Sequence, residues 1–214
     1  MKKIFTLCLT VFLLGAVTET YAQTFGIKAG VNLANQTAKD DDDNYDDDNK
    51  MNIGFNVGVT LDIPISDVVS FETGLIASSK GSKVEGEGFE SKTNLLYADI
   101  PLTAKFSFEI NRDSKFYIAA GPYVGIGLSG KSKFKIDGGD EEEDDIKWGS
   151  DEAEDDMKRL DYGAQVNIGA EFSGFQIGAG YGLGLANIAP SDANGFKATN
   201  NVISVTVGYR FGGN

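Results

Sequence analysis

The feature that most constrains the fold is an alternation of apolar residues with polar or small ones, which recurs along most of the chain. In residues 24–34 every second residue is apolar (Phe25, Ile27, Ala29, Val31, Leu33), and the residues between them are Thr24, Gly26, Lys28, Gly30 and Asn32. The same pattern occupies residues 52–61, 160–172 and 203–211. A period of two places the apolar side chains on one face of an extended strand. The chain is therefore predicted to be all-β, with strands that have two unlike faces.

Eight such runs are predicted as strands, and the connections between them alternate in length. The predicted strands cover residues 24–34, 51–62, 68–79, 93–108, 115–130, 158–172, 175–188 and 201–211. The connections over residues 35–50, 80–92, 131–157 and 189–200 are long, whereas residues 63–67, 110–114 and 173–174 make tight turns. Most runs reach the roughly 9–11 residues that a tilted strand needs to cross a bilayer. An even number of strands with this alternation of connections is typical of a bacterial outer-membrane barrel.

The composition of the two faces separates a membrane barrel from a soluble one. A soluble barrel is filled by apolar side chains, whereas the polar face here carries Gly, Asn, Ser, Gln and a few charges, which suit the lumen of a membrane barrel. Nine aromatic residues beside the short turns or the chain ends are predicted to form a girdle at the periplasmic interface: Phe25, Phe71, Phe106, Phe108, Phe116, Phe172, Phe175, Tyr209 and Phe211. We therefore predict an eight-stranded antiparallel transmembrane β-barrel with long acidic extracellular loops and periplasmic termini.

The first residues of the chain indicate export. Lys2 and Lys3 precede an apolar run over residues 4–17, and small residues occupy the positions before a cleavage point after Ala22. This is the layout of a secretory signal peptide. A membrane anchor is disfavoured, because the run is shorter than the roughly 20 residues of a spanning helix. Residues 1–22 are predicted to be the signal peptide and residues 23–214 the barrel domain, located in the outer membrane.

Composition excludes several classes of function. The chain has no histidine, and its single cysteine, Cys8, lies in the predicted signal peptide. Histidine-based catalysis and histidine zinc sites are therefore excluded, and the mature domain can form no disulfide. The net charge of −13 argues against nucleic acid as a partner. We expect no cofactor, no catalytic residues and no enzymatic activity.

Charged residues on the predicted polar face lie in the half of each strand nearest the short turns. They are Lys28, Glu72, Lys105, Glu171 and Arg210. Eight strands enclose an interior just wide enough for side chains to fill. Because an unpaired buried charge is destabilising, the five side chains are predicted to pair with one another. We predict an ion-pair plug near the periplasmic end, below an upper lumen lined by Gly and Asn.

Three dense acidic runs occupy two of the predicted outer loops. Residues 40–43 with 46–48 lie in the loop over residues 35–50, and residues 140–145 and 151–156 lie in the loop over residues 131–157. Carboxylates suit hard cations such as calcium, but no EF-hand spacing is present. We predict no specific metal site, and at most weak divalent binding at Asp41, Asp43, Asp46 and Asp48. Dense like charges repel one another, so the favoured interpretation is a solvated, mobile loop.

Several segments resemble the PorT-like outer-membrane β-barrel family of Bacteroidetes. The similarity covers nearly all of the predicted mature chain, and it is carried by residues 25–33, 96–105, 121–125, 181–188 and 208–211. The resemblance implies an outer-membrane, porin-like barrel fold. It does not imply one activity, because the family is functionally broad.

Our functional prediction is a non-enzymatic, monomeric barrel in contact with outer-membrane lipids. Its role is expected to be structural, or to consist of binding other envelope proteins or extracellular ligands through the loops. Two alternatives remain open at this stage. The PorT resemblance implies a component of a protein export machinery, and the polar lumen allows a narrow solute channel.

Overall fold

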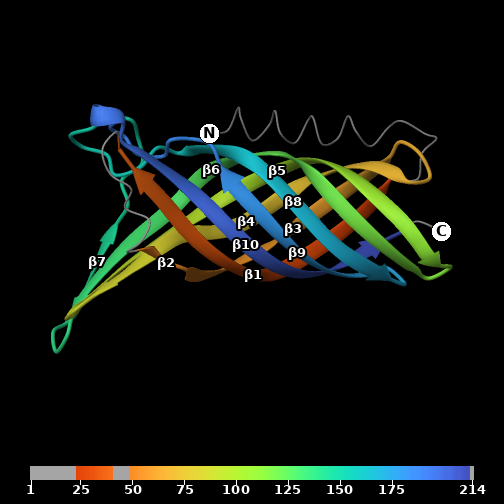
Figure 1. Ribbon diagram of the computed structural model, residues 1–214, viewed down its shortest axis with the longest axis horizontal. Helices are drawn as coiled ribbons and strands as arrows, with labels where there is room; N and C mark the ends of the chain where they lie inside the picture. Colours follow the sequence, from red (N-terminus) through yellow and green to blue (C-terminus); the bar gives the residue numbers. More distant parts are fainter. Residues whose placement is uncertain (1–22, 41–48, 213–214) are drawn as a thin grey trace.

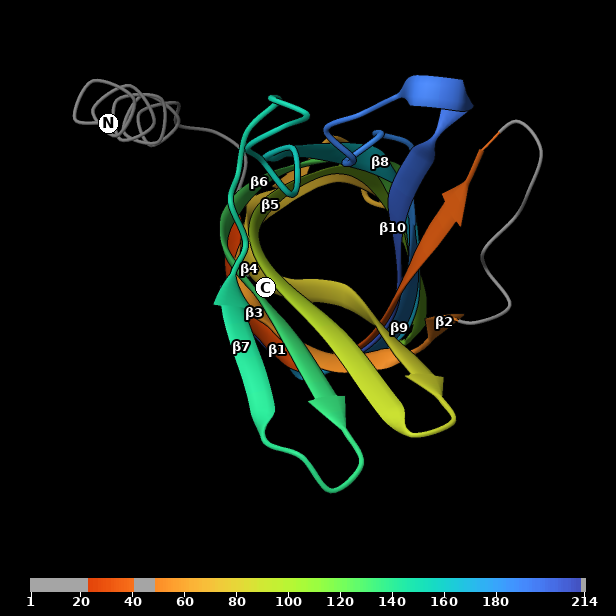
Figure 2. The same cartoon turned by 90° about the vertical axis from the view of Figure 1, so that its left-hand side faces the viewer.

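The computed structural model describes residues 23–40 and 49–212, which form one antiparallel ring of strands. The predicted signal peptide lies outside the described residues. Eight long strands build the ring (Figures 1 and 2). They are β1 (Thr24–Lys39), β3 (Asn52–Pro64), β4 (Val69–Gly86), β5 (Phe89–Asn111), β6 (Ser114–Ile136), β8 (Leu160–Phe172), β9 (Phe175–Gly184) and β10 (Lys197–Phe211). Three short elements are β2 (Asn49–Lys50), β7 (Glu141–Asp145) and the 3-10 helix η3 (Ala193–Gly195).

The ring closes through neighbours in the chain and through one pairing of its two ends. Each long strand pairs with the next long strand along the chain, and β1 pairs with β10 from Phe25↔Phe211 to Lys39↔Lys197. All of these pairings are antiparallel. The predicted eight-stranded antiparallel β-barrel is thus confirmed. Among the described residues, no helix is long and apolar enough to span a membrane.

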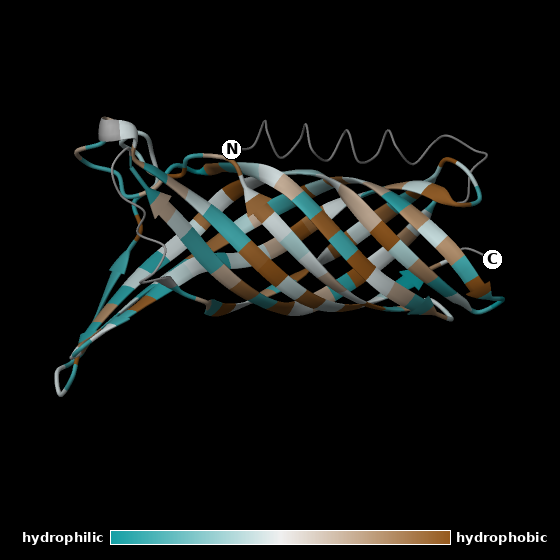
Figure 3. Ribbon diagram, in the orientation of Figure 1, coloured by the Kyte–Doolittle hydropathy of each residue, from teal (hydrophilic) through white to brown (hydrophobic). Residues whose placement is uncertain are grey.

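The two faces of the strands differ as the alternation predicts. Apolar side chains on the outside are exposed, including Ile53 at 69% and Val207 at 58%, whereas inward-facing Asn32 and Thr103 are at most 1% exposed. Figure 3 shows hydrophobic and hydrophilic residues alternating along each strand around the ring. The apolar surface therefore lies outside and the polar surface inside, the reverse of a soluble barrel.

Short turns connect the strands at one end of the barrel. Residues 65–68 join β3 to β4, residues 112–113 join β5 to β6, and Ser173-Gly174 joins β8 to β9. Ser173 and Gly174 both have positive φ, 49° and 85°. Positive φ at both central residues is the conformation that matches the twist of a two-residue hairpin.

At the other end, β4, β5 and β6 continue well beyond the ring (Figure 1). We call this part the strand extension. It consists of β4 after Lys80, β5 before Leu95 and β6 after Gly130, and β2 and β7 pair with its outer strands. The prediction of a long loop over residues 80–92 is wrong, because β4 and β5 stay paired until the two-residue turn before Phe89. Alternation of apolar residues ends near residue 80, but backbone pairing does not.

The acidic run at residues 140–145 also differs from the predicted mobile loop. Glu141–Asp145 forms β7, antiparallel to residues 131–135 of β6. Lys133 Nζ lies 2.6 Å from Glu141 Oε1 and 2.8 Å from Glu143 Oε2, and Lys131 also pairs with Glu143. These cations offset the repulsion between the carboxylates, which is why a strand forms here.

Candidate functional site in the barrel lumen

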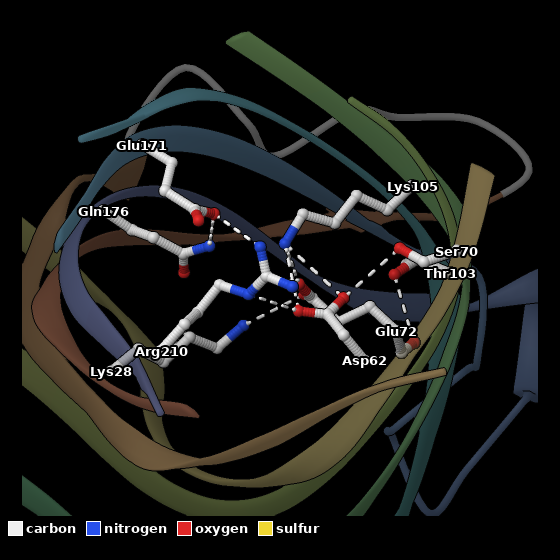
Figure 4. A network of polar contacts seen from close by, with 9 residues as sticks. All are labelled: Lys28, Asp62, Ser70, Glu72, Thr103, Lys105, Glu171, Gln176 and Arg210. Atoms are coloured by element: carbon white, nitrogen blue, oxygen red, sulfur yellow. Dashed lines mark hydrogen bonds and ion pairs between the residues drawn. The ribbon is translucent and has the colours of Figure 1, made fainter. Parts of the chain in front are cut away.

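The first group of charged side chains lies in the lumen near the short turns, and we call it the lower layer (Figure 4). Lys105 is 1% exposed, and its Nζ lies 3.2 Å from Asp62 Oδ2 and 3.0 Å from Glu72 Oε2. Arg210 lies 3.1 Å from Asp62 through Nε and 2.7 Å from Glu171 through Nη1. Lys105 and Arg210 therefore share Asp62 as a common counter-ion.

Two further contacts complete the lower layer. Lys28 Nζ lies 3.8 Å from Glu72 Oε1, and Gln176 donates a hydrogen bond of 3.0 Å to Glu171. The layer thus brings together all five side chains of the predicted plug and adds Asp62. Asp62 comes two residues after the inward-facing Thr60, so the alternation alone could have placed its side chain in the lumen.

The six charges come from six different strands. Lys28 lies on β1, Asp62 on β3, Glu72 on β4, Lys105 on β5, Glu171 on β8 and Arg210 on β10. Three cations face three carboxylates, so the charges in the lower layer balance. Burial without pairing would be strongly unfavourable for each of these groups. The pairs therefore link strands across the lumen as well as between neighbours.

A second group, the upper layer, lies toward the strand extension, and the alternation of apolar residues does not predict it. Lys80 is 3% exposed, and its Nζ lies 3.0 Å from Asp99 Oδ1 and 2.9 Å from Asp161 Oδ2. The ammonium also lies over two rings, 4.8 Å from the centroid of Tyr97 and 4.5 Å from that of Tyr123. Such contacts stabilise a cation that has lost its water.

Asp161 is the most enclosed member of the upper layer. Its side chain is 0% exposed, and Oδ2 accepts hydrogen bonds from Lys80 and from Asn200 Nδ2 at 2.9 and 3.1 Å. Asp161 Oδ1 has no partner among the described residues. Asp99, on the same layer, approaches β6 closely at Gly125, where a Cβ would lie 2.4 Å from Asp99 Oδ1.

A polar cavity of about 110 Å³ separates the two layers. Charged residues of both layers border it, including Lys28 and Glu72 below and Lys80 and Asp99 above. Most of its remaining wall consists of amide and hydroxyl side chains: Asn32, Asn56, Thr60, Ser78, Tyr117, Tyr123, Gln165, Asn167, Gln176, Ser204 and Thr206. The predicted Gly- and Asn-lined upper lumen corresponds in part to this wall.

An apolar cluster covers the upper layer on the side of the strand extension. Leu95, Tyr97, Ala186 and Ile188 form its buried part, and Trp148 packs against it with its ring edge-on to Tyr97 at 5.6 Å. Trp148 comes from the segment between β7 and β8, and Ile188 from the segment between β9 and β10. These connections therefore fold back over the barrel end.

The predicted aromatic girdle lies on the outer face near the short turns. Phe25, Phe106, Phe108, Phe116, Phe172, Phe175 and Phe211 are between 38% and 65% exposed, whereas Phe71 and Tyr209 are partly buried. Tyr209 contacts the rings of Phe175 and Phe211, with centroids 4.8 and 5.0 Å apart. A membrane interface at this level stays a prediction. Asp41, Asp43, Asp46 and Asp48 lie outside the described residues.

Comparison with known proteins assigns the family. Residues 21–189 match the family model described as outer membrane protein beta-barrel domain. A search of curated protein sequences finds no match. The similar solved structures include Ail of Yersinia pestis with a heparin analogue (18% identity, 90% of this chain and 100% of that chain, TM-score 0.41). They also include Neisserial surface protein A (15%, 87% and 97%, 0.41) and OprG of Pseudomonas aeruginosa (15%, 90% and 98%, 0.40).

Proposed function

Since the chain belongs to the outer membrane protein β-barrel domain family, we propose that it is an outer-membrane barrel with a closed lumen that acts through its strand extension. The extension is the part that meets extracellular ligands or other envelope proteins. The barrel itself anchors it in the lipid. We assign the chain no catalytic role, because it has no histidine and its buried carboxylates are engaged with cations.

The lengths of β5 and β6 carry this proposal. Each strand has 23 residues, about twice the 9–11 that cross a bilayer. The residues beyond this length carry charges on one face. There Lys83 of the neighbouring β4 pairs with Glu85 of β4 at 2.6 Å and with Glu90 of β5 at 3.0 Å. A surface of this kind is suited to water, not to lipid. Strands that are longer than the membrane requires therefore form a platform outside it.

The proposed orientation follows from the distribution of long and short connections. In bacterial outer-membrane barrels the short turns are periplasmic and the long connections extracellular. The strand extension then faces the outside of the cell, and the termini and the lower layer lie toward the periplasm. The predicted signal peptide over residues 1–22 would direct this export.

Two epitope tags placed at matched turns test the orientation. One tag is inserted at residues 87–88, the tip of the β4–β5 hairpin, and the other at residues 112–113, the β5–β6 turn at the opposite end. Protease added to intact cells should remove only the first tag, and the protein should fractionate with the outer membrane. Cleavage of the second tag alone would reverse the orientation, and recovery as a soluble protein would refute the membrane assignment.

A site-specific crosslinker tests the interaction role. Placed at Glu90 on the strand extension, it should capture an envelope or extracellular partner in living cells, whereas the same probe at Asp113 should not. In a second variant, residues 82–92 are replaced by a two-residue turn and the crosslinker is placed at a position of the extension that remains. The barrel should still assemble, but no partner should be captured. Equal capture at Glu90 and Asp113 would contradict a specific role for the extension.

A further inference from the structure

The charged side chains enclosed in the described lumen do not sum to zero. The four cations are Lys28, Lys80, Lys105 and Arg210, and the five carboxylates are Asp62, Glu72, Asp99, Asp161 and Glu171. Lys115 and Glu109, near the short-turn end, are more exposed and pair with each other. One negative charge therefore has no counter-charge from these side chains. An uncompensated charge in such an enclosed place requires a bound cation or a proton.

The surplus charge belongs to the upper layer and faces the cavity. The charges of the lower layer balance. In the upper layer, the single charge of Lys80 is shared between Asp99 and Asp161. Asp161 is fully enclosed and also accepts a hydrogen bond from Asn200. Asp99 is 15% exposed and borders the cavity. A ligand in the cavity can therefore reach Asp99, whereas Asp161 is closed off from it.

A second observation concerns Asn56, which borders the same cavity and is 6% exposed. Its Nδ2 donates to Asn32 Oδ1 at 2.7 Å, but its Oδ1 has no partner among the described residues. A buried carbonyl oxygen without a partner is unfavourable. Asn56 and Asp99 thus border the same cavity, and both carry acceptor oxygens, which favours a ligand that is a cation or a donor.

We propose that the cavity between the two layers is a binding site for one small monovalent cation, of the size of sodium, potassium or ammonium. Oxygen ligands suit such hard cations. A single positive charge neutralises the lumen, whereas a divalent ion would leave an excess positive charge in the same enclosure. The volume of about 110 Å³ corresponds to three or four waters at about 30 Å³ each. The cation and a few of its waters therefore fit.

Gly182 provides a variant that removes the space and leaves the charges. It borders the cavity, and the nearest atom to a Cβ at this position is Val202 O at 3.9 Å. Gly182→Leu therefore places a side chain at the cavity wall, with only an ordinary van der Waals contact at its Cβ. The matched control is Ala179→Leu, on the outer face of the same strand, where the side chain is exposed. Asp99→Asn is the complementary variant, because it leaves four cations facing four carboxylates.

The test measures thermal unfolding of the purified barrel in detergent at constant ionic strength, with choline chloride replaced stepwise by sodium, potassium or ammonium chloride. A cation bound to the folded state stabilises it with a saturating dependence on concentration. We expect the midpoint of the wild type and of Ala179→Leu to rise by about 3–5 °C at tenfold excess over the dissociation constant. Gly182→Leu and Asp99→Asn should not respond. Rubidium should also give an anomalous diffraction peak in the cavity of crystals of the wild type and of Ala179→Leu, but not of Gly182→Leu or Asp99→Asn.

Three results would overturn the proposal. An equal, non-saturating response in all four proteins would mean that the cations act only on the acidic surface. No response in the wild type, with stability that falls as the pH rises and is insensitive to pH in Asp99→Asn, would show that a proton neutralises the layer. If Asp99→Asn does not fold, Gly182→Leu decides: a folded Gly182→Leu barrel that keeps the saturating response would place the cation elsewhere.

Discussion

Lys105 illustrates how a buried side chain is paired inside this barrel. Its amine is 1% exposed, yet Asp62 and Glu72 lie within 3.2 Å and the ring of Tyr117 lies 4.8 Å from its Nζ. Neighbouring carboxylates replace the water that the ammonium loses. Asp62 is the central residue of this arrangement, because it also contacts Arg210 at 3.1 Å.

We predict that Asp62→Ala destabilises the folded barrel by about 3–5 kcal/mol, because two buried cations lose their shared counter-ion. Urea unfolding of the refolded protein in detergent measures the loss. Glu109→Ala is the control, since it removes the exposed partner of Lys115 and should change stability by at most about 1 kcal/mol. Equal effects of the two variants would show that the lower layer contributes no more than a surface pair.

At the scale of elements, two different interactions stabilise the hairpins at the two ends of the barrel. The short turn Ser173-Gly174 requires positive φ at both residues, a conformation that Gly and Asn adopt more readily than Ser. At the other end, cross-strand ion pairs stabilise the strand extension, where the alternation of apolar residues has ended. Local conformation and side-chain pairing therefore act at opposite ends of the barrel.

Ser173→Asn should stabilise the β8–β9 hairpin by about 0.5–1 kcal/mol, because Asn tolerates the left-handed conformation and Asn-Gly is the preferred sequence for this turn. Gly174→Ala should destabilise it, since φ is 85° and a Cβ would lie 3.0 Å from Arg210 O. The unfolding midpoint in urea checks both. A loss of stability in Ser173→Asn would contradict this account of the turn.

The strand extension allows a prediction about pH. Hydrogen bonds from Lys131 and Lys133 lower the pKa of Glu143 to about 2, from an ordinary value of 4.5. A carboxyl with a lowered pKa stabilises the paired form above its ordinary pKa, and this stabilisation is lost as the pH falls toward 2. β7 should therefore stay paired at pH values near 4.5.

An NMR titration of the Glu143 carboxyl tests this directly. Lys133→Met should raise the measured pKa toward 4.5, and the amides of β7 should then lose protection at a higher pH than in the wild type. Lys135→Met is the control, because no ion pair of Lys135 holds β7 in the structure described over this segment. An unchanged titration in Lys133→Met would contradict the assigned cause.

For the whole molecule, the arrangement is two charged layers in series around a cavity. Both layers connect strands that are distant in the chain, since Lys80 and Asp161 are 81 residues apart and Arg210 and Glu171 are 39 apart. We infer a lumen that stays shut unless both layers are disturbed. The narrow-channel alternative requires at least a transient opening of each layer.

Planar-bilayer recording separates these cases. The wild type, Lys80→Ala and Arg210→Ala should each show no conductance steps, because at least one intact layer remains in every case. The double variant should conduct. Conductance of the wild type that changes when Lys28 or Arg210 is neutralised would instead favour a narrow solute channel over a plugged barrel.

Period-two alternation predicted most of this architecture because it is a local property. It located all eight long strands, their apolar outer face and the tight turns, and inward parity also marked Lys28, Glu72, Lys105, Glu171 and Arg210 as lumen residues. It missed the continuation of β4 and β5 beyond residue 80, because that pairing depends on backbone hydrogen bonds and ion pairs between strands. Lys80 was consequently placed in a loop.

The sequence by itself determined the strands and the membrane-type division of their faces, because both depend on the order of residues within short segments. Only the tertiary structure decided which charges meet. Register and stagger around the closed ring bring Lys80 from β4 to Asp99 on β5 and Asp161 on β8, and place Asp62 between Lys105 and Arg210. Those juxtapositions depend on how all eight strands close together, and no single segment contains that information.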